Sequence, residues 1–300
     1  MKKSLFMTVL IICVLGLTLS CAKDNQGEVT AEKGKTITDS LGREIIIDKY
    51  PEKIISISPA ITEILFALGL NEEIIGVSNY CDYPEEAQGK EKVGGFEDPN
   101  VEVIIAKNPD LVFASAGVQE ELIKKLEGLN IKVAVLDADN IEEVIANIVI
   151  TGKITGKERK AEEIASAMTQ KLEEIRAKVK DQPKPKVFVE VWDDPLMSAG
   201  SGSFIHSIIE DAGGINVAAD NSERYYTFSM EKLLEIDPDI YIINTHSHKP
   251  ADVKNRNGYH VLSAVQNNKV YAIDDSLISR AGPRVIQGLE EMAQIIHPEL

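Results

Sequence analysis

The chain has 300 residues, of which 44% are hydrophobic, and its formal net charge is −16. This length allows one large domain or two of ordinary size, and the hydrophobic content is sufficient for real cores. The excess of 48 acidic over 32 basic residues argues against sequence-independent binding of nucleic acid, which needs a basic surface.

The N-terminus has the pattern of an export signal. Two lysines follow Met1, and residues 5–19 form an apolar run that is too short for a comfortable membrane span. The run ends in Leu-Thr-Leu-Ser-Cys, which resembles a lipobox with Cys21 as the lipidated first residue, although Thr stands where Leu is usual. We predict a signal peptide over 1–20 and a lipid-anchored, flexible tether over 21–35. An ordinary signal peptide with an incidental Cys21 is the alternative.

Cysteine chemistry is limited to three residues. Cys13 would leave with the signal peptide, and Cys21 is the predicted lipidation site. Only Cys81 remains, so neither a disulfide framework nor a cysteine metal cluster is possible. We expect Cys81 to be a small packed residue.

Strands alternate with helices in the first half of the mature chain. A hairpin is expected over 36–48. The apolar runs that follow predict short strands at 53–58 and 74–78. The helical patterns predict a helix from Pro59, helix–turn–strand units at 100–115 and 120–138, and a helix at 141–156. This alternation predicts an α/β lobe over 36–156 with a mainly parallel sheet.

A long amphipathic helix is predicted over 157–182. Its apolar residues recur at gaps of three and four, no Gly or Pro interrupts them, and Pro183 and Pro185 end the pattern. About 24 residues would make a rod of roughly 36 Å, enough to span a small domain. Such a helix resists wide bending, so we expect little movement between the segments before and after it.

The same alternation returns over 183–300. The predicted elements are a strand at 186–191, a helix at 203–214, a helix–turn–strand unit at 229–244, a strand at 267–275 and a final helix at 283–300. Two blocks repeat: 101–112 matches 230–241 and 132–137 matches 269–274. In the first block, Glu102 and Glu231 each stand seven residues before Pro-Asp. We therefore predict two related, Rossmann-like α/β lobes joined by one long, rigid helix, with a ligand cleft between them.

Several of these segments resemble one family of proteins. They are TDSLGREIII, KIISISPAITEILFALG, VGGFEDPNVEVIIAKNPDLVFAS, AGGINVAAD and SMEKLLEIDPDIYI. The chain resembles, over residues 36–300, the helix-linked class of ABC-importer substrate-binding proteins, whose members serve cobalamin, ferric siderophores and haem. The segments NYCDYP, VGGFEDPN and RAGPRVIQGLEEMAQIIHPE look most like the cobalamin-binding members.

The resemblance implies a function without catalysis. It predicts an exported, lipid-anchored monomer that captures cobalamin or a related corrinoid and delivers it to a dimeric permease with ATPase subunits. The sequence has no GxSxG, HExxH or P-loop motif, so we expect no enzyme activity, no resident cofactor and no nucleic-acid partner. A siderophore or haem ligand is the alternative. An exported chelatase-like enzyme, and a surface sensor or adhesion module, are hypotheses from other classes.

Candidate ligand contacts lie in loops at the expected cleft. Aromatic side chains suit a large flat macrocycle, which is held mainly by apolar contacts and a few hydrogen bonds. The candidates are Tyr80, Phe96 and Trp192, with Ser58 and Tyr83 as secondary ones and Arg280 and Arg284 as polar contacts near the last helix. Ordinary loop packing, or a solvated arginine, is the alternative for each.

Two further groups concern docking and metal. Glu102 and Glu231 fall in the first turns of matched helices, where the helix dipole alone could favour a carboxylate. The resemblance implies instead that each lobe presents one Glu to a two-fold permease. His246 and His248 form an HxH pair that could bind metal, but no third ligand stands at an obvious spacing, so we predict no metal site.

Overall fold

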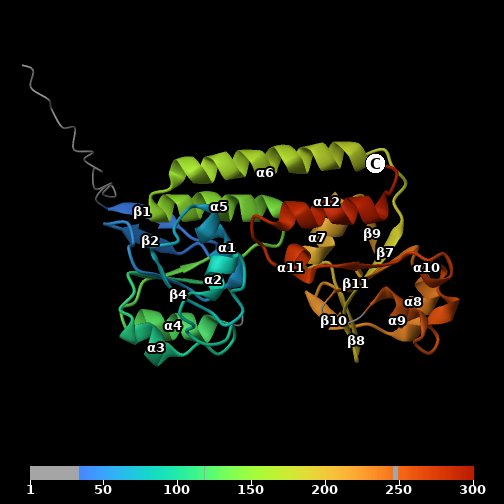
Figure 1. The fold of residues 1–300 in the computed structure, drawn as a ribbon, viewed down its shortest axis with the longest axis horizontal. Coiled ribbons are helices and arrows are strands. Elements are labelled where there is room, and N and C mark those ends of the chain that lie inside the picture. The colour runs from blue at the N-terminus through green and yellow to red at the C-terminus, as the bar shows by residue number, and fades with distance from the viewer. Residues whose placement is uncertain (1–33, 118, 246–248) are drawn as a thin grey trace, which may run out of the picture.

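A computed structural model describes residues 34–117, 119–245 and 249–300, and Figure 1 shows two lobes lying side by side beneath one long helix. The predicted signal peptide, most of the tether with Cys21, and the pair His246 and His248 lie outside the described residues. No helix in the described ranges combines the length and apolar character that crossing a membrane requires.

The first lobe contains a four-stranded sheet with the order β4-β3-β5-β6, in which all neighbours are parallel. A separate antiparallel hairpin, β1 with β2, confirms the turn predicted over 36–48. The elements are β1 Lys35–Thr38, β2 Glu44–Ile47, β3 Ile54–Ser56, α1 Pro59–Ala67, β4 Ile74–Val77, α2 Glu85–Gln88, α3 Val101–Ala106, β5 Leu111–Ala114, α4 Glu120–Gly128, β6 Val133–Val135 and α5 Ile141–Thr155.

The second lobe contains a mixed sheet with the order β10-β8-β7-β11-β12, and β9 also pairs with β7. The elements are β7 Lys186–Asp193, β8 Leu196–Ala199, α7 Phe204–Asp211, β9 Ile215–Asn216, β10 Tyr225–Thr227, α8 Met230–Ile236, β11 Ile240–Asn244, α9 Pro250–Lys254, the 3-10 turn η1 Tyr259–Val261, α10 Ser263–Gln266, β12 Val270–Ile273, α11 Asp275–Ser279 and α12 Val285–Ile296. Strands β7, β11 and β12 run parallel, as predicted, whereas β8 and β10 are antiparallel additions that the sequence did not indicate.

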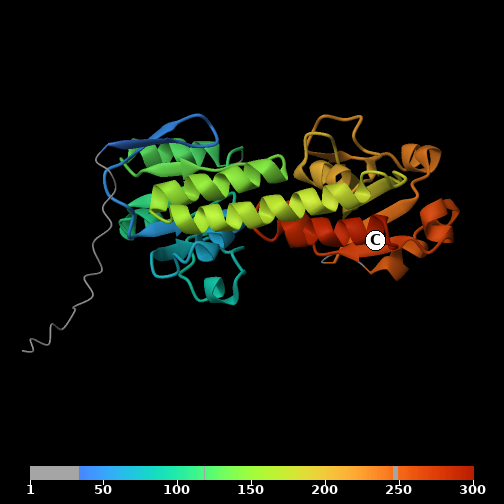
Figure 2. The ribbon, with the colours of Figure 1, turned by 90° about the horizontal axis from the view of Figure 1, so that it is seen from above.

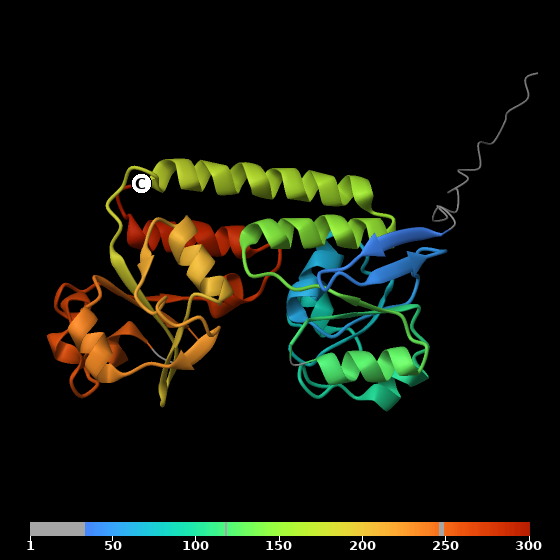
Figure 3. The ribbon, with the colours of Figure 1, turned by 180° about the vertical axis from the view of Figure 1, so that it is seen from behind.

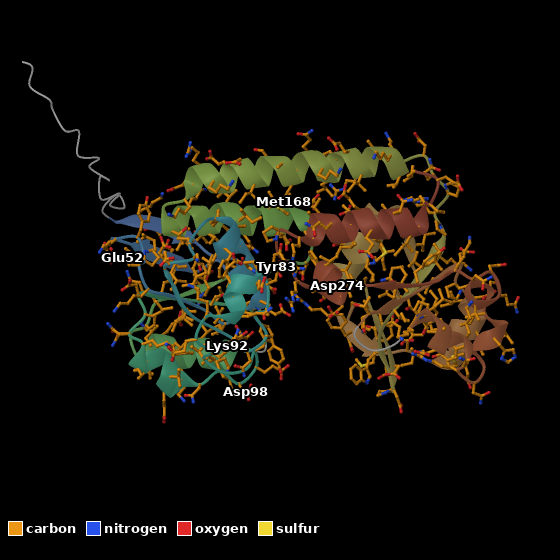
Figure 4. The ribbon with its side chains drawn as sticks, viewed as in Figure 1. Glu52, Tyr83, Lys92, Asp98, Met168 and Asp274 are labelled. Atoms are coloured by element: carbon orange, nitrogen blue, oxygen red, sulfur yellow. The ribbon has the colours of Figure 1, made fainter. Side chains whose placement is uncertain are left out.

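Helix α6, Glu158–Val179, lies across both lobes. It packs along α5 of the first lobe and α12 of the second; Figure 2 shows it from above, running along them, and Figure 3 shows it above both helices from behind. Its buried stripe follows the predicted spacing and includes Met168, which faces these two helices (Figure 4). A Cβ at Gly152 of α5 would lie 2.4 Å from the Cβ of Ala161, so a glycine permits the close α5–α6 contact.

The internal repeat is present in three dimensions. Asn108 and Asp237, which occupy matching positions before Pro-Asp, have positive φ angles of 47° and 48°. The next carboxylates act alike: Asp110 accepts a hydrogen bond from Lys53 N at the start of β3, and Asp239 accepts one from Lys186 N at the start of β7. The order β3-β5-β6 in one sheet thus corresponds to β7-β11-β12 in the other, which confirms two related lobes.

Candidate functional site

A cavity of about 1140 Å³, here called the interlobe cavity, lies between the lobes. Loops at the carboxyl ends of the parallel strands form one wall, and segments around β10 and the end of α11 form the other. This is where open α/β sheets usually bind ligands. Pockets for drug-sized molecules measure roughly 300–1,000 Å³, so the volume suits a large ligand.

Four of the predicted ligand contacts line this cavity together: Ser58, Tyr80, Phe96 and Arg280. Ser58 follows β3 and is the N-cap residue of α1, where it is buried, whereas the Tyr80 side chain is largely exposed. Ser58, Tyr80 and Phe96 lie in loops of the first lobe, whereas Arg280 follows α11 of the second lobe.

The other candidates lie in neighbouring cavities. Tyr83 and Arg284 line a cavity of about 510 Å³ at the junction of α1 and α12, and the Arg284 guanidinium lies 3.9 Å from the centre of the Tyr83 ring. Figure 4 shows Tyr83 on the side of the first lobe that faces the second. Trp192 lines a third cavity of about 330 Å³ within the second lobe. The structure therefore does not bring Tyr83 and Trp192 into one group with Tyr80 and Phe96.

A buried amide organises the first-lobe wall. Gln119 is fully buried, and its Nε2 donates to the carbonyl oxygens of Ile57, at 3.2 Å, and Phe96, at 2.7 Å. Its Oε1 accepts a hydrogen bond from Ser115 N at 2.8 Å. One side chain thus connects three loops that border the cavity. Sequence reasoning missed Gln119, because nothing in its local pattern distinguishes it from a solvated residue before a helix.

Buried ion pairs join the lobes on the side of α1 and α12. Glu63 of α1, whose side chain is 2% exposed, accepts two hydrogen bonds from Arg284, at 2.9 and 2.6 Å. Arg280 lies 3.6 Å from the same carboxylate and also pairs with Asp82. The hydrogen bond from Arg280 holds the pKa of Asp82 below its ordinary value of 3.8, although burial opposes this shift. Because Glu63 is removed from water, these arginines have a structural role whatever else they do.

A second, exposed bridge crosses the cavity rim. Arg224 of the second lobe lies 3.1 Å from Asp137 and 2.6 Å from Asp139, both of which follow β6 in the first lobe. The Arg224 side chain is 50% exposed, so solvent screens the pair. Arg224 and Arg280, the cations that line the interlobe cavity in the described structure, are therefore both held by carboxylates, and Glu97 and Asp98 add further acidic groups to the lining.

Comparison with known proteins identifies the architecture. The family model described as "Periplasmic binding protein" matches residues 54–277. The chain belongs to this family. An uncharacterized ABC transporter substrate-binding lipoprotein, YvrC of Bacillus subtilis (strain 168), is 35% identical over 272 residues, which cover 88% of this chain and 86% of that protein.

Solved structures of other proteins share the fold. The vitamin B12-binding protein BtuF of Vibrio cholerae has a TM-score of 0.74 and 26% identity, covering 82% of this chain and 96% of that one. A possible iron-binding (periplasmic solute-binding) protein of Staphylococcus epidermidis ATCC 12228 has a TM-score of 0.73 and 30% identity, covering 83% and 100%. This periplasmic binding protein is accordingly an extracytoplasmic, non-enzymatic substrate-binding protein of an ABC transporter.

The two candidate docking residues of the binding protein occupy equivalent surfaces. Glu102 and Glu231 are exposed in the first turns of α3 and α8, which are capped by Asn100 and Ser229 respectively. Figure 1 shows both helices on the side of the lobes away from α6. One turn later each helix exposes an apolar side chain, Ile105 at 43% and Leu234 at 38%. The repeat therefore presents the same pair, an acid followed by an aliphatic residue, once on each lobe.

The remaining predictions concern cysteine and metal. Cys81 is buried, with its Sγ 3.1 Å from Thr62 Oγ1 and 3.2 Å from Ser78 Oγ, which confirms a packed residue. Within the described ranges, no group of three or more His, Cys, Asp or Glu side chains is arranged to bind a metal ion.

Proposed function

We propose that this binding protein captures cobalamin or a related corrinoid in the interlobe cavity and delivers it to a membrane permease. The observation that carries the proposal is the character of the cavity: it is large, Tyr80 and Phe96 border it, and carboxylates already hold its arginines. A corrinoid is a bulky macrocycle whose periphery consists mostly of neutral amides. Such a ligand is held mainly by aromatic and apolar contacts, with a few hydrogen bonds.

Charge distinguishes the corrinoid from the alternatives. Haem carries two propionates and many ferric siderophores are anionic, so each would favour a basic cleft. The lining here includes Glu97 and Asp98 beside two arginines that are already paired with carboxylates. The likeness to the vitamin B12-binding protein supports the corrinoid, while the likeness to the possible iron-binding protein keeps a ferric siderophore as the second candidate.

Delivery requires docking and proximity to the membrane. We propose that Glu102 and Glu231 each pair with a cation on one half of a two-fold permease, because the repeat places one exposed acid on each lobe. Ile105 and Leu234, one turn further on, would add an apolar contact to each of these pairs. A lipid on Cys21 would hold the protein at the membrane surface.

This function is tested by measuring the uptake of radiolabelled cyanocobalamin in a strain of the source bacterium from which the gene for this protein has been deleted. The unaltered chain should restore uptake. The double reversal Glu102→Lys with Glu231→Lys should abolish uptake, because like charges then face each other at both contacts, while leaving cyanocobalamin affinity unchanged.

The matched control reverses Glu44 and Glu210, which are exposed acids, one on each lobe, on other elements. This control should transport normally. A loss of ligand affinity in the Glu102 and Glu231 variant equal to its loss of uptake would contradict a docking role. Failure of the unaltered chain to support cyanocobalamin uptake would contradict the corrinoid.

A further inference from the structure

In the described part of the chain, ion pairs cross between the lobes at both edges of the first-lobe sheet, and they are here called the rim bridges. The edge strands of that sheet are β4 and β6. Asp82, in the loop after β4, pairs with Arg280. Asp137 and Asp139, which follow β6, pair with Arg224. Both arginines line the interlobe cavity, so charged contacts between the lobes bracket one of its walls.

Elsewhere the lobes are held together more firmly. Helix α6 packs on helices of both lobes, and the largest hydrophobic cluster of the described residues extends through this contact. Arg176 of α6 also joins the lobes, because its Nη1 lies 2.6 Å from Glu142 of α5 and its Nη2 lies 2.7 Å from Asp211 of α7. Widening of the interlobe cavity is therefore resisted least at the rim bridges.

The two rim bridges are not held equally. The side chains of Arg224 and Asp139 are 50% and 58% exposed. The Arg280 side chain is only 21% exposed, and it also lies 3.6 Å from the buried carboxylate of Glu63. Ion pairs between exposed side chains are weak and are screened by salt, whereas partly buried pairs are screened less. The Arg224 bridge should therefore break first.

We propose that the rim bridges are a latch on the interlobe cavity. The Arg224 bridge opens on the β6 side to admit a bulky ligand, and it closes again once the ligand is inside. A cavity of about 1140 Å³ suits a large ligand, which needs a wider opening than a small molecule does. The latch is a property of the cavity, so it does not depend on whether the ligand is a corrinoid.

Thiol labelling inside the cavity tests the latch without any transported ligand. Ala116 lines the interlobe cavity, so Ala116→Cys in the mature chain with Cys21→Ser places a thiol there, while the native Cys81 is buried. N-ethylmaleimide and N-(1-pyrenyl)maleimide are both uncharged and carry the same reactive group, but they differ in bulk. The ratio of their reaction rates, bulky over small, measures how often the cavity opens widely, because the reactivity of the thiol itself cancels.

Variants of the Arg224 bridge should change this ratio. Asp137→Asn combined with Asp139→Asn removes the charges that hold Arg224 and keeps the size of both side chains. The ratio should rise about two- to fivefold, the range expected for the loss of an exposed pair. Arg224→Gln should act alike, and combining all three substitutions should add nothing, because they break one bridge. The matched control is Arg159→Gln, an exposed position on α6 that should leave the ratio unchanged.

Thermal melting establishes that every variant folds. An unchanged ratio in the variants of the Arg224 bridge would overturn the latch. So would a rise in Arg224→Gln without a rise in the double Asn variant, because the smaller side chain, and not the broken bridge, would then explain it. A rise in Arg159→Gln equal to that of the bridge variants would also contradict the latch. Failure of the protein to bind any corrinoid would overturn the proposed function and leave this result unaffected.

Discussion

At the residue scale, the first-lobe wall of the cavity depends on Gln119. Replacing Gln119 with Ala removes the partner of Ser115 N and of the carbonyl groups of Ile57 and Phe96. Each buried group left without a partner costs about 1–3 kcal/mol, so the loss of partners for all three groups should lower the free energy of unfolding by at least about 3 kcal/mol. Ligand affinity should also fall, because the loop that carries Phe96 loses its anchor.

Urea unfolding and ligand titration of the same sample measure both effects. Gln170→Ala is the control, since Gln170 is exposed on α6 and should change stability by no more than about 0.5 kcal/mol. Equal stabilities for the two variants would show that the buried amide does not hold the loops.

Residues that follow a strand were predictable, whereas residues defined by tertiary contacts were not. Ser58, Tyr80 and Phe96 stand in loops after apolar runs, so their place at the cleft could be read from the sequence. The partnership of Glu63 with Arg284 joins positions 221 residues apart, and no local pattern reveals it. Arg224 is hidden for the same reason.

At the scale of elements, two helical glycines have opposite roles. Gly152 of α5 lies against Ala161 of α6, whereas a Cβ at Gly128 of α4 would meet nothing within 4 Å. Gly128→Ala should stabilise the protein by up to about 1 kcal/mol, because Ala is the better helix former. Gly152→Ala should destabilise it by about 1–3 kcal/mol, because α6 is pushed away from α5. Melting temperatures that rise in both variants would contradict close α5–α6 packing.

The elements with strong periodicity were predicted well. The apolar stripe of α6 and the repeated helix–turn–strand units depend on local spacing, which the sequence contains directly. Strands β9 and β10 were missed because they are short and pair with strands that are distant in the sequence. Strand β8 was also missed, although it forms a tight antiparallel hairpin with β7, because it is only four residues long.

At the scale of the whole molecule, two sets of ion pairs connect the lobes with unequal strength. Arg284→Gln leaves Glu63 buried without its main partner, and breaking such a buried pair typically costs about 3–5 kcal/mol. Arg224→Gln breaks only an exposed pair and should cost no more than about 1 kcal/mol. Denaturant unfolding of the two variants measures the difference, and equal losses would contradict it.

This inequality bears on how the lobes move. The largest hydrophobic cluster of the described residues contains side chains from both lobes and from α6. The buried Glu63–Arg284 pair adds a polar connection between the lobes. The exposed bridges of Arg224 to Asp137 and Asp139, and of Arg280 to Asp82, would have to break for the cleft to widen at its rim. Small lobe movement on ligand binding stays a prediction, and this arrangement agrees with it.

The central claim is that a corrinoid is the ligand. The most direct measurement titrates the mature chain, with Cys21→Ser to prevent lipidation, separately with cyanocobalamin, haemin and an anionic ferric catecholate siderophore. We predict a dissociation constant of about 1 μM or lower for cyanocobalamin, and much weaker binding of the two other ligands. Binding of haemin or the siderophore without any binding of cyanocobalamin would contradict it.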